Sequence, residues 1–261
     1  MGVTLMLLDG PMGTELERRG VSTEGRGWSA YAIDAAPDVV RSIHEDYVRA
    51  GAELHRANTF RTQPGVFPVE WRVLLGKAVR LAREAAGSRV IGSIAPVEDC
   101  YRPELSPSSD EARRAHDAVA RAFVEEGISR VVCETFPHAG EARVAVECAV
   151  RAGLETWVAL TAGPDGALMT PAAMEVAARD CVAAGASAVL VCCTGAEITR
   201  SYVERIAKVG APFGAYANGY GVAPDRYAAL AAEWVRAGAG IVGACCGTGP
   251  AHVARLRSLG A

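Results

Sequence analysis

The chain has 261 residues, a length that one α/β barrel of about 250 residues would account for. Hydrophobic residues make up 50% of it and charged residues 22%, so a large core is available and a disordered chain is excluded. The 27 basic and 30 acidic residues give a formal net charge of −3 without a basic stripe, so we expect no nucleic-acid partner.

The start of the chain contains an apolar run that is short and that no basic segment precedes. A secretory signal peptide is therefore not expected, and no run of about 18 apolar residues could span a membrane. We expect a cytoplasmic protein without a membrane partner. In such a protein, eight cysteines favour metal or thiol chemistry over a disulfide scaffold.

Strand-like apolar runs alternate with helix-like amphipathic runs along the chain. We expect strands at residues 5–8, 53–57, 89–94, 130–133, 156–160, 187–191, 212–215 and 240–243. We expect helices at residues 37–50, 69–86, 109–126, 139–152, 172–184, 197–208, 224–237 and 250–259. A glycine lies between helix and strand at Gly51, Gly127, Gly153, Gly185 and Gly238, where it can end the helix in the left-handed conformation.

Eight such repeats indicate parallel β/α architecture. An open doubly wound sheet is the alternative, but no glycine-rich dinucleotide loop follows the first expected strand. We therefore predict an α/β fold, a single (β/α)8 TIM barrel, that forms one domain over residues 1–261.

In a barrel, the residues that follow the strands converge on one pocket. The irregular segments 21–36, 58–68 and 96–108 follow the first three expected strands, and we expect them at this face. The strand ends carry Asp9, Asn58, Ser93, Glu134, Thr161, Cys192-Cys193, Tyr216-Ala217-Asn218 and Cys245-Cys246. None of these ends carries a histidine, which argues against a Ser-His-Asp triad and against a histidine-ligated hydrolase.

Three or four converging thiols without a nearby histidine indicate zinc in a sulfur site. A structural zinc site normally uses two cysteines on one short loop, whereas Cys193 and Cys245 are 245 − 193 = 52 residues apart. Metal ligands from distant strands at the mouth of a barrel are more typical of a catalytic site. Three protein ligands also leave one coordination position of the metal open. Core packing, a redox pair and a disulfide between the two loops are the alternatives.

Several segments resemble the homocysteine S-methyltransferase family. Gly243-Ala244-Cys245-Cys246-Gly247-Thr248 is similar to the Gly-Gly-Cys-Cys-Gly-Thr that ends the family's last strand. The other segments that carry the resemblance are 8–16, 28–30, 44–52, Ala57-Asn58-Thr59-Phe60, 92–96 and Cys133-Glu134-Thr135-Phe136. They extend over nearly the whole chain.

The resemblance implies a TIM barrel that binds Zn²⁺ through Cys193, Cys245 and Cys246. It also implies transfer of a methyl group from a sulfonium donor, S-methylmethionine or S-adenosylmethionine, to the thiol of homocysteine, which gives methionine. Coordination to zinc would remove the proton of the acceptor thiol and make it a nucleophile.

The resemblance further implies that acidic groups at Asp9 and Glu134 bind the ammonium of the acceptor. We place Asn58 and Tyr216 in the same substrate site. A sulfonium donor could lie against an aromatic face, for which the candidates are Tyr101, Tyr216 and Tyr220.

The chain departs from the family pattern near the expected substrate. Cys192 stands where the family has Asn, Ala244 replaces the second Gly of the zinc motif, and Ala217 replaces the Pro of Tyr-Pro-Asn. The segment 97–109 is short, and without a long C-terminal arm we expect a monomer or a weak homo-oligomer. Three alternatives follow: another thiol or selenol acceptor, the carbon of a 2-oxo acid, and a non-enzymatic barrel that stores zinc or senses redox state.

Overall fold

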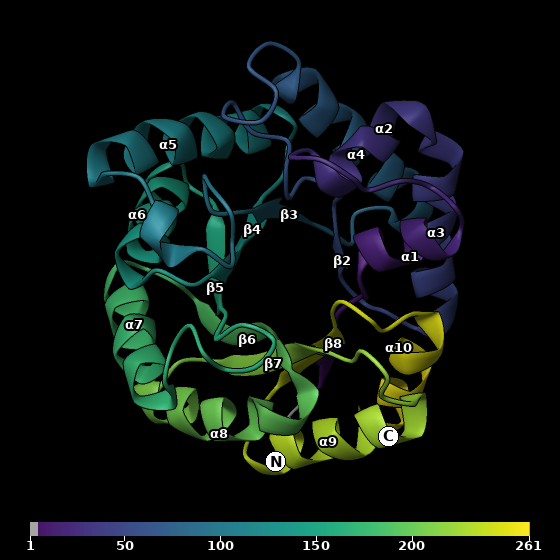
Figure 1. Ribbon diagram of the computed structural model, residues 1–261, viewed down its shortest axis with the longest axis vertical. Coiled ribbons are helices and arrows are strands. Elements are labelled where there is room, and N and C mark those ends of the chain that lie inside the picture. The colour runs from purple at the N-terminus through teal and green to yellow at the C-terminus, as the bar shows by residue number, and fades with distance from the viewer. Residues whose placement is uncertain (1–4, 261) are drawn as a thin grey trace.

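The computed structural model describes residues 5–260, in which eight parallel strands form a ring surrounded by helices (Figure 1). Neighbouring strands pair in the order β1-β8-β7-β6-β5-β4-β3-β2. The strands are β1 (Met6–Leu7), β2 (His55–Arg56), β3 (Val90–Ile94), β4 (Arg130–Phe136), β5 (Glu155–Leu160), β6 (Ala188–Gly195), β7 (Phe213–Asn218) and β8 (Ile241–Ala244).

The ring closes between β1 and β2, the two shortest strands. Leu8 and Leu54 form a parallel bridge. The Glu53 N–H donates to the Leu7 carbonyl at 2.8 Å, and the Asp9 N–H donates to the Leu54 carbonyl at 3.1 Å. The prediction of a (β/α)8 barrel is therefore confirmed, and the open sheet is excluded. That residues 1–261 form one domain stays a prediction.

Helices cover the outside of the ring (Figure 1). They are α1 (Met12–Arg18), α2 (Ala32–Ala35), α3 (Pro37–Ala50), α4 (Trp71–Ala86), α5 (Ser109–Glu125), α6 (Ala139–Arg151), α7 (Pro171–Ala183), α8 (Ala196–Ile206), α9 (Pro224–Arg236) and α10 (Pro250–Leu256). Every expected helix is present. The structure adds α1, α2 and 3₁₀ turns at Trp28–Tyr31 and Pro103–Leu105, which are too short to show a helical period in the sequence.

The glycines between helices and strands end the helices as expected. Their φ angles are 97° at Gly51, 66° at Gly127, 86° at Gly153, 108° at Gly185 and 102° at Gly238. A side chain in this region clashes with the following carbonyl, so glycine is the residue that allows the chain to leave each helix and enter the next strand.

Two apolar layers result from the alternation of side chains along the strands. One fills the space between strands and helices. The other lies inside the barrel, where residues from or beside every strand meet: Leu8, Leu54, Ile91, Val132, Trp157, Leu190, Tyr216 and Ile241. Cys192, Cys193 and Cys245 belong to this inner cluster. The thiols therefore lie where the packed interior opens to the carboxyl ends of the strands.

In residues 5–260, none of the helices combines the length and the apolar character that a bilayer crossing requires. The cytoplasmic location stays a prediction.

Among the glycines, Gly214 in β7 leaves the least room for a side chain. A Cβ atom at this position would lie 1.8 Å from the carbonyl oxygen of Ile241 in β8. Because that neighbour is backbone, it cannot turn aside. We predict that Gly214→Ala lowers the free energy of unfolding by about 3 kcal/mol or more, as strained overpacking does.

The matched control is Gly153→Ala, where φ is positive but nothing lies within 4 Å of the added methyl. It should cost only the strain of the left-handed conformation, about 1 kcal/mol. Urea denaturation of both variants measures the difference. Equal losses of unfolding free energy in the two variants would show that the backbone of β8 does not crowd a side chain at position 214.

Candidate active site

A cavity of about 660 Å³ opens at the carboxyl ends of the strands. Its walls come from the strand ends and from the three long segments that follow β1, β2 and β3, as expected for a barrel. Cys193, Cys245 and Cys246 line it together with Asp9 and Glu134. The structure thus brings six of the seven predicted site residues to one cavity. Asn58 also lines the cavity, whereas Tyr216 lies behind it.

The thiols of β6 and β8 lie side by side. The Sγ atoms of Cys193 and Cys245 are 3.0 Å apart. Cys193 has a φ of 49° and Thr135, opposite it on β4, a φ of 63°, conformations that non-glycine residues rarely adopt. The Thr135 hydroxyl lies 3.3 Å from the Cys193 Sγ, and its N–H donates to the Cys192 Sγ at 3.2 Å. Contacts from Thr135 on β4, which β5 separates from β6, thus hold the Sγ atoms of Cys192 and Cys193.

Without a cation these thiols stay protonated at neutral pH. Hydrogen bonds to Cys192 and then to Cys245, together with burial, raise the pKa of Cys193. The neighbouring Cys193 thiol raises the pKa of Cys246, to which burial adds. A cation that binds here must displace protons, so the site suits a metal that thiolates hold strongly.

The donor set fits zinc. A tetrahedral site with Zn–S bonds of about 2.3 Å places its sulfurs about 3.8 Å apart. The observed separation of 3.0 Å between Cys193 and Cys245 requires these two sulfurs to move apart by less than 1 Å. The third thiol, Cys246, lines the same cavity and is the most exposed of the three. Three soft ligands around an open cavity leave a fourth position for a substrate.

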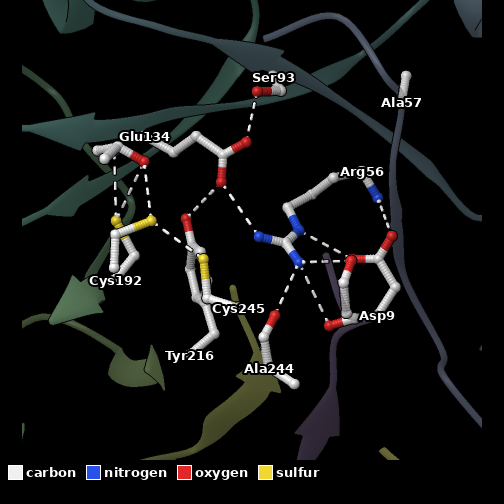
Figure 2. Close-up of polar contacts among 12 residues, drawn as sticks. Asp9, Arg56, Ala57, Ser93, Glu134, Cys192, Tyr216, Ala244 and Cys245 are labelled. Atoms are coloured by element: carbon white, nitrogen blue, oxygen red, sulfur yellow. Dashed lines mark hydrogen bonds and ion pairs between the residues drawn. The ribbon is translucent and has the colours of Figure 1, made fainter. Parts of the chain in front are cut away.

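Arg56, at the end of β2, also lines this cavity, and sequence reasoning missed it. Its Nε donates to Asp9 Oδ1 at 2.8 Å, and its backbone N–H donates to Asp9 Oδ2 at 3.0 Å. Its Nη1 donates to Glu134 Oε2 at 3.2 Å. The side chain is 9% exposed. Figure 2 shows the thiols on one side and Arg56 with Asp9 on the other, with Glu134 and Tyr216 between them.

Three backbone carbonyls hold the other end of the guanidinium. Nη2 of Arg56 lies 3.3, 3.2 and 3.1 Å from the carbonyl oxygens of Asp9, Gly10 and Ala244. The guanidinium carbon Cζ of Arg56 lies 4.5 Å from the centre of the Tyr216 ring. Burial lowers the pKa of Arg56, but Asp9 and Glu134 more than offset this and raise it well above its ordinary value. The cation is permanent.

Glu134 is held from three directions. Ser93 donates its hydroxyl to Oε1, and Oε2 accepts from the Tyr216 hydroxyl at 2.8 Å and from Arg56. Tyr216 is fully buried, so its hydroxyl orients Glu134 from behind. Burial, with the nearby thiols and Glu134, raises the pKa of Tyr216, which keeps its proton on the donated bond.

The amide of Asn58 is engaged with a loop. Its Nδ2 donates to the Ser29 carbonyl at 2.9 Å, and its Oδ1 accepts from the Ser29 hydroxyl at 2.7 Å. The side chain thereby fixes the segment after β1 against the end of β2. A direct contact with substrate stays a prediction for Asn58, as do the roles of the other site residues.

Of the three tyrosines considered for a sulfonium donor, two line the cavity. Tyr101 is 37% exposed and Tyr220 is 66% exposed. The face of Tyr216 is covered by Arg56. Trp28 and Phe60 add an edge-to-face aromatic pair to the wall, with ring centres 5.8 Å apart.

A second group of metal-binding side chains lies beside the first. One ligand atom each from Asp9, His44 and His55 falls within 4.8 Å of the others. Both histidines are fully buried, and neither lines the cavity. Both carboxylate oxygens of Asp9 accept from Arg56. A dication here would lie next to a guanidinium, and of its three ligands Asp9 alone lines the cavity.

The period of a strand could have identified Arg56. Leu54, Arg56 and Asn58 are every second residue of the expected strand and so share one face, and Leu54 packs inside the barrel. An arginine on that face must be buried and paired. His44 carried no such signal, because its place on an amphipathic helix is compatible with ordinary core packing.

Known proteins match this chain along most of its length. Residues 6–259 match the family model described as homocysteine S-methyltransferase. The homocysteine S-methyltransferase of Escherichia coli strain K12 is 27% identical over 97% of this chain and 94% of its own length. The S-methylmethionine–homocysteine S-methyltransferase BHMT2 of Pongo abelii is 30% identical over 75% of this chain and 54% of its own length.

A solved structure shares the whole architecture. The homocysteine methyltransferase MmuM from Escherichia coli, in its metallated form, superposes with a TM-score of 0.85 at 26% identity. The match covers 98% of this chain and 96% of that one.

The buried imidazole of His44 makes the stability of the barrel depend on pH. Burial lowers its pKa from 6.5 to about 4, and neither ring nitrogen has a partner among residues 5–260. Between these two pH values the unfolded chain binds the proton and the folded chain does not. The stability is therefore complete above pH 6.5 and decreases as the pH falls toward 4.

When the pH is lowered from 7 to 4, we predict that wild type loses about 3 kcal/mol more of its unfolding free energy than His44→Leu does. Urea denaturation of wild type and variant at both pH values measures this. Parallel pH profiles would show that His44 is not held neutral in the folded protein.

Proposed function

This chain belongs to the homocysteine S-methyltransferase family, and on that basis we propose that it moves a methyl group from a sulfonium donor to the sulfur of a thiol acceptor with the help of Zn²⁺. The chain is an S-methyltransferase of this family. The observation that carries the zinc proposal is the meeting of three thiols, from β6 and from the end of β8, in one cavity.

Cys193, Cys245 and Cys246 would hold the metal. When bound, zinc supplies a Lewis acid that lowers the pKa of the acceptor thiol and so provides a nucleophile without a general base. This is consistent with a cavity that no histidine lines among residues 5–260. The strained backbone at Cys193 and Thr135 holds one of the ligands in place before the metal arrives.

The far end of the acceptor would meet the polar wall opposite the thiols. Asp9, Arg56 and Glu134 form this wall, and Ser93 and Tyr216 fix its geometry. Homocysteine is the acceptor named for the relatives, and it is the first acceptor to test. A different acceptor is the second candidate, because Arg56 places a cation in this wall.

The donor would enter from the open side of the cavity. Tyr101, Tyr220 and Trp28 offer aromatic faces to a sulfonium cation there. Methyl transfer between a thiolate and a sulfonium cancels opposite charges, so a wall of aromatic side chains that excludes water favours it. S-methylmethionine and S-adenosylmethionine are the two donors we propose.

The direct test is methyl transfer by reduced, zinc-loaded protein. We predict that homocysteine incubated with one of the two sulfonium donors is converted to methionine, which mass spectrometry detects. The metal-free protein should be inactive, and activity should return when zinc is restored. Equal methionine formation with and without zinc would contradict the proposed mechanism.

Two cysteine variants distinguish a proposed metal ligand from an ordinary buried thiol. We predict that Cys246→Ala loses both bound zinc and methyl transfer while its circular dichroism spectrum is unchanged. Cys181→Ala is the matched control, because Cys181 is a fully buried thiol of helix α7 within the outer apolar layer. It should keep one zinc per chain by metal analysis. Turnover by a metal-free Cys246→Ala protein would disprove the role of the metal.

A further inference from the structure

Asp9 and Glu134 already have a cation between them. The guanidinium of Arg56 forms an ion pair with Asp9 at 2.8 Å and with Glu134 at 3.2 Å. These are the two carboxylates that would otherwise receive the ammonium of an amino-acid acceptor. The chain therefore carries, in its own side chain, the positive charge that an amino acid would bring.

This cation is fixed in place. Three backbone carbonyls surround Nη2, and the ring of Tyr216 lies beneath the guanidinium. These contacts come from the ends of β1, β7 and β8, so Arg56 cannot leave without losing several of them at once. An ammonium that approached Asp9 or Glu134 would meet a buried like charge that cannot move away.

The carboxylates are also engaged on their other sides. Both oxygens of Asp9 accept from Arg56, through its Nε and through its backbone N–H. Oε2 of Glu134 accepts from Tyr216 and Arg56, and Oε1 accepts from Ser93. Oε2 has no lone pair left, because a carboxylate oxygen accepts about two hydrogen bonds. What remains is a poor site for the three donors of an ammonium.

One donor of Arg56 remains for a ligand. A guanidinium has five N–H groups, two of them on Nη1. Glu134 is the single partner of Nη1 among residues 5–260, and Arg56 lines the cavity. The second Nη1 hydrogen is thus available to an oxygen of the acceptor, and a guanidinium N–H bonds more strongly to a carboxylate than to a neutral oxygen.

We infer that the preferred acceptor is a thiol acid without an α-ammonium group, whose carboxylate binds Arg56 while its sulfur lies at the three cysteines. This inference rests on the proposed function. In the transfer, the bond between the donor sulfur and its methyl breaks, and its electron pair stays on the donor as a neutral thioether. The acceptor sulfur forms the new bond to the methyl and has lost its proton to solvent.

Three acceptors that differ by one group each test this. Homocysteine carries both charged groups, 4-mercaptobutanoic acid lacks the ammonium, and 3-aminopropane-1-thiol lacks the carboxylate. Two quantities are measured for each: kcat/KM with the donor, and the dissociation constant by calorimetry without donor, on zinc-loaded and on metal-free reduced protein. For wild type we expect 4-mercaptobutanoic acid to exceed homocysteine at least tenfold in both, and 3-aminopropane-1-thiol to be the weakest.

Two variants test whether Arg56 causes the preference for 4-mercaptobutanoic acid over homocysteine. Arg56→Gln should lower the ratio of kcat/KM for 4-mercaptobutanoic acid to kcat/KM for homocysteine by tenfold or more. Arg56→Lys, which keeps the charge, should retain the wild-type order of acceptors. Arg61→Gln is the matched control, because Arg61 lines the same cavity and donates to the Glu98 carbonyl without contacting Asp9 or Glu134. It should leave the ratio unchanged.

A wild-type preference for homocysteine would overturn the inference, even if Arg56→Gln failed to fold. An unchanged ratio in a folded Arg56→Gln protein would also overturn it, as would binding of none of the three thiols. Failure of the proposed function gives a different result, in which the expected order of binding is seen but no thiol is methylated. Methylation with homocysteine as the best acceptor would leave the function intact and remove only the inference.

Discussion

The arginine at the end of β2 spans the junction where this barrel closes and shapes the wall of its site. β1 and β2 have two residues each, so few backbone hydrogen bonds join them. Arg56 crosses that junction and contacts groups at the ends of β1, β4 and β8. A buried charge is tolerated only when it is paired and hydrogen-bonded. Asp9 and Glu134 therefore hold Arg56, and through it the wall of the cavity.

This network gives the cavity two chemically distinct ends. One end offers three thiols, which suit a soft metal and the sulfur of an acceptor. The other end offers a fixed cation whose carboxylate partners are already engaged. Glu134 and Tyr216, joined by a hydrogen bond, lie between these ends (Figure 2). The acceptor that we infer bridges them, with its sulfur at the thiols and its carboxylate at Arg56.

Much of this arrangement could be predicted from the sequence. Apolar runs and the glycines after the helices identified eight β/α units, and the geometry of a barrel then placed Cys193, Cys245 and Cys246 at one mouth. These inferences succeed because they depend on local periodicity and on chain topology. The short helices α1 and α2 escaped detection because one or two turns show no period.

The partners of individual polar side chains could not be predicted in the same way. That Asp9 binds a substrate ammonium stays a prediction, but its pairing with Arg56, which lies 47 residues further along the chain, was not anticipated. A substrate contact of Tyr216 likewise stays a prediction, while its burial and its hydrogen bond to Glu134 were not anticipated. Such pairings depend on how strands meet across the barrel, and a single sequence does not contain that information. The proximity of His44 and His55 to Asp9 was missed for the same reason.

Two groups of potential metal ligands lie near one another, and the proposed chemistry requires that the cysteines bind the zinc. X-ray absorption at the zinc edge decides between them. We predict three sulfur neighbours at about 2.3 Å in the resting protein and a fourth when an acceptor thiol is added. A shell of nitrogen and oxygen that does not change with the thiol would place the metal at Asp9, His44 and His55. That result would contradict the proposed role of the cysteines.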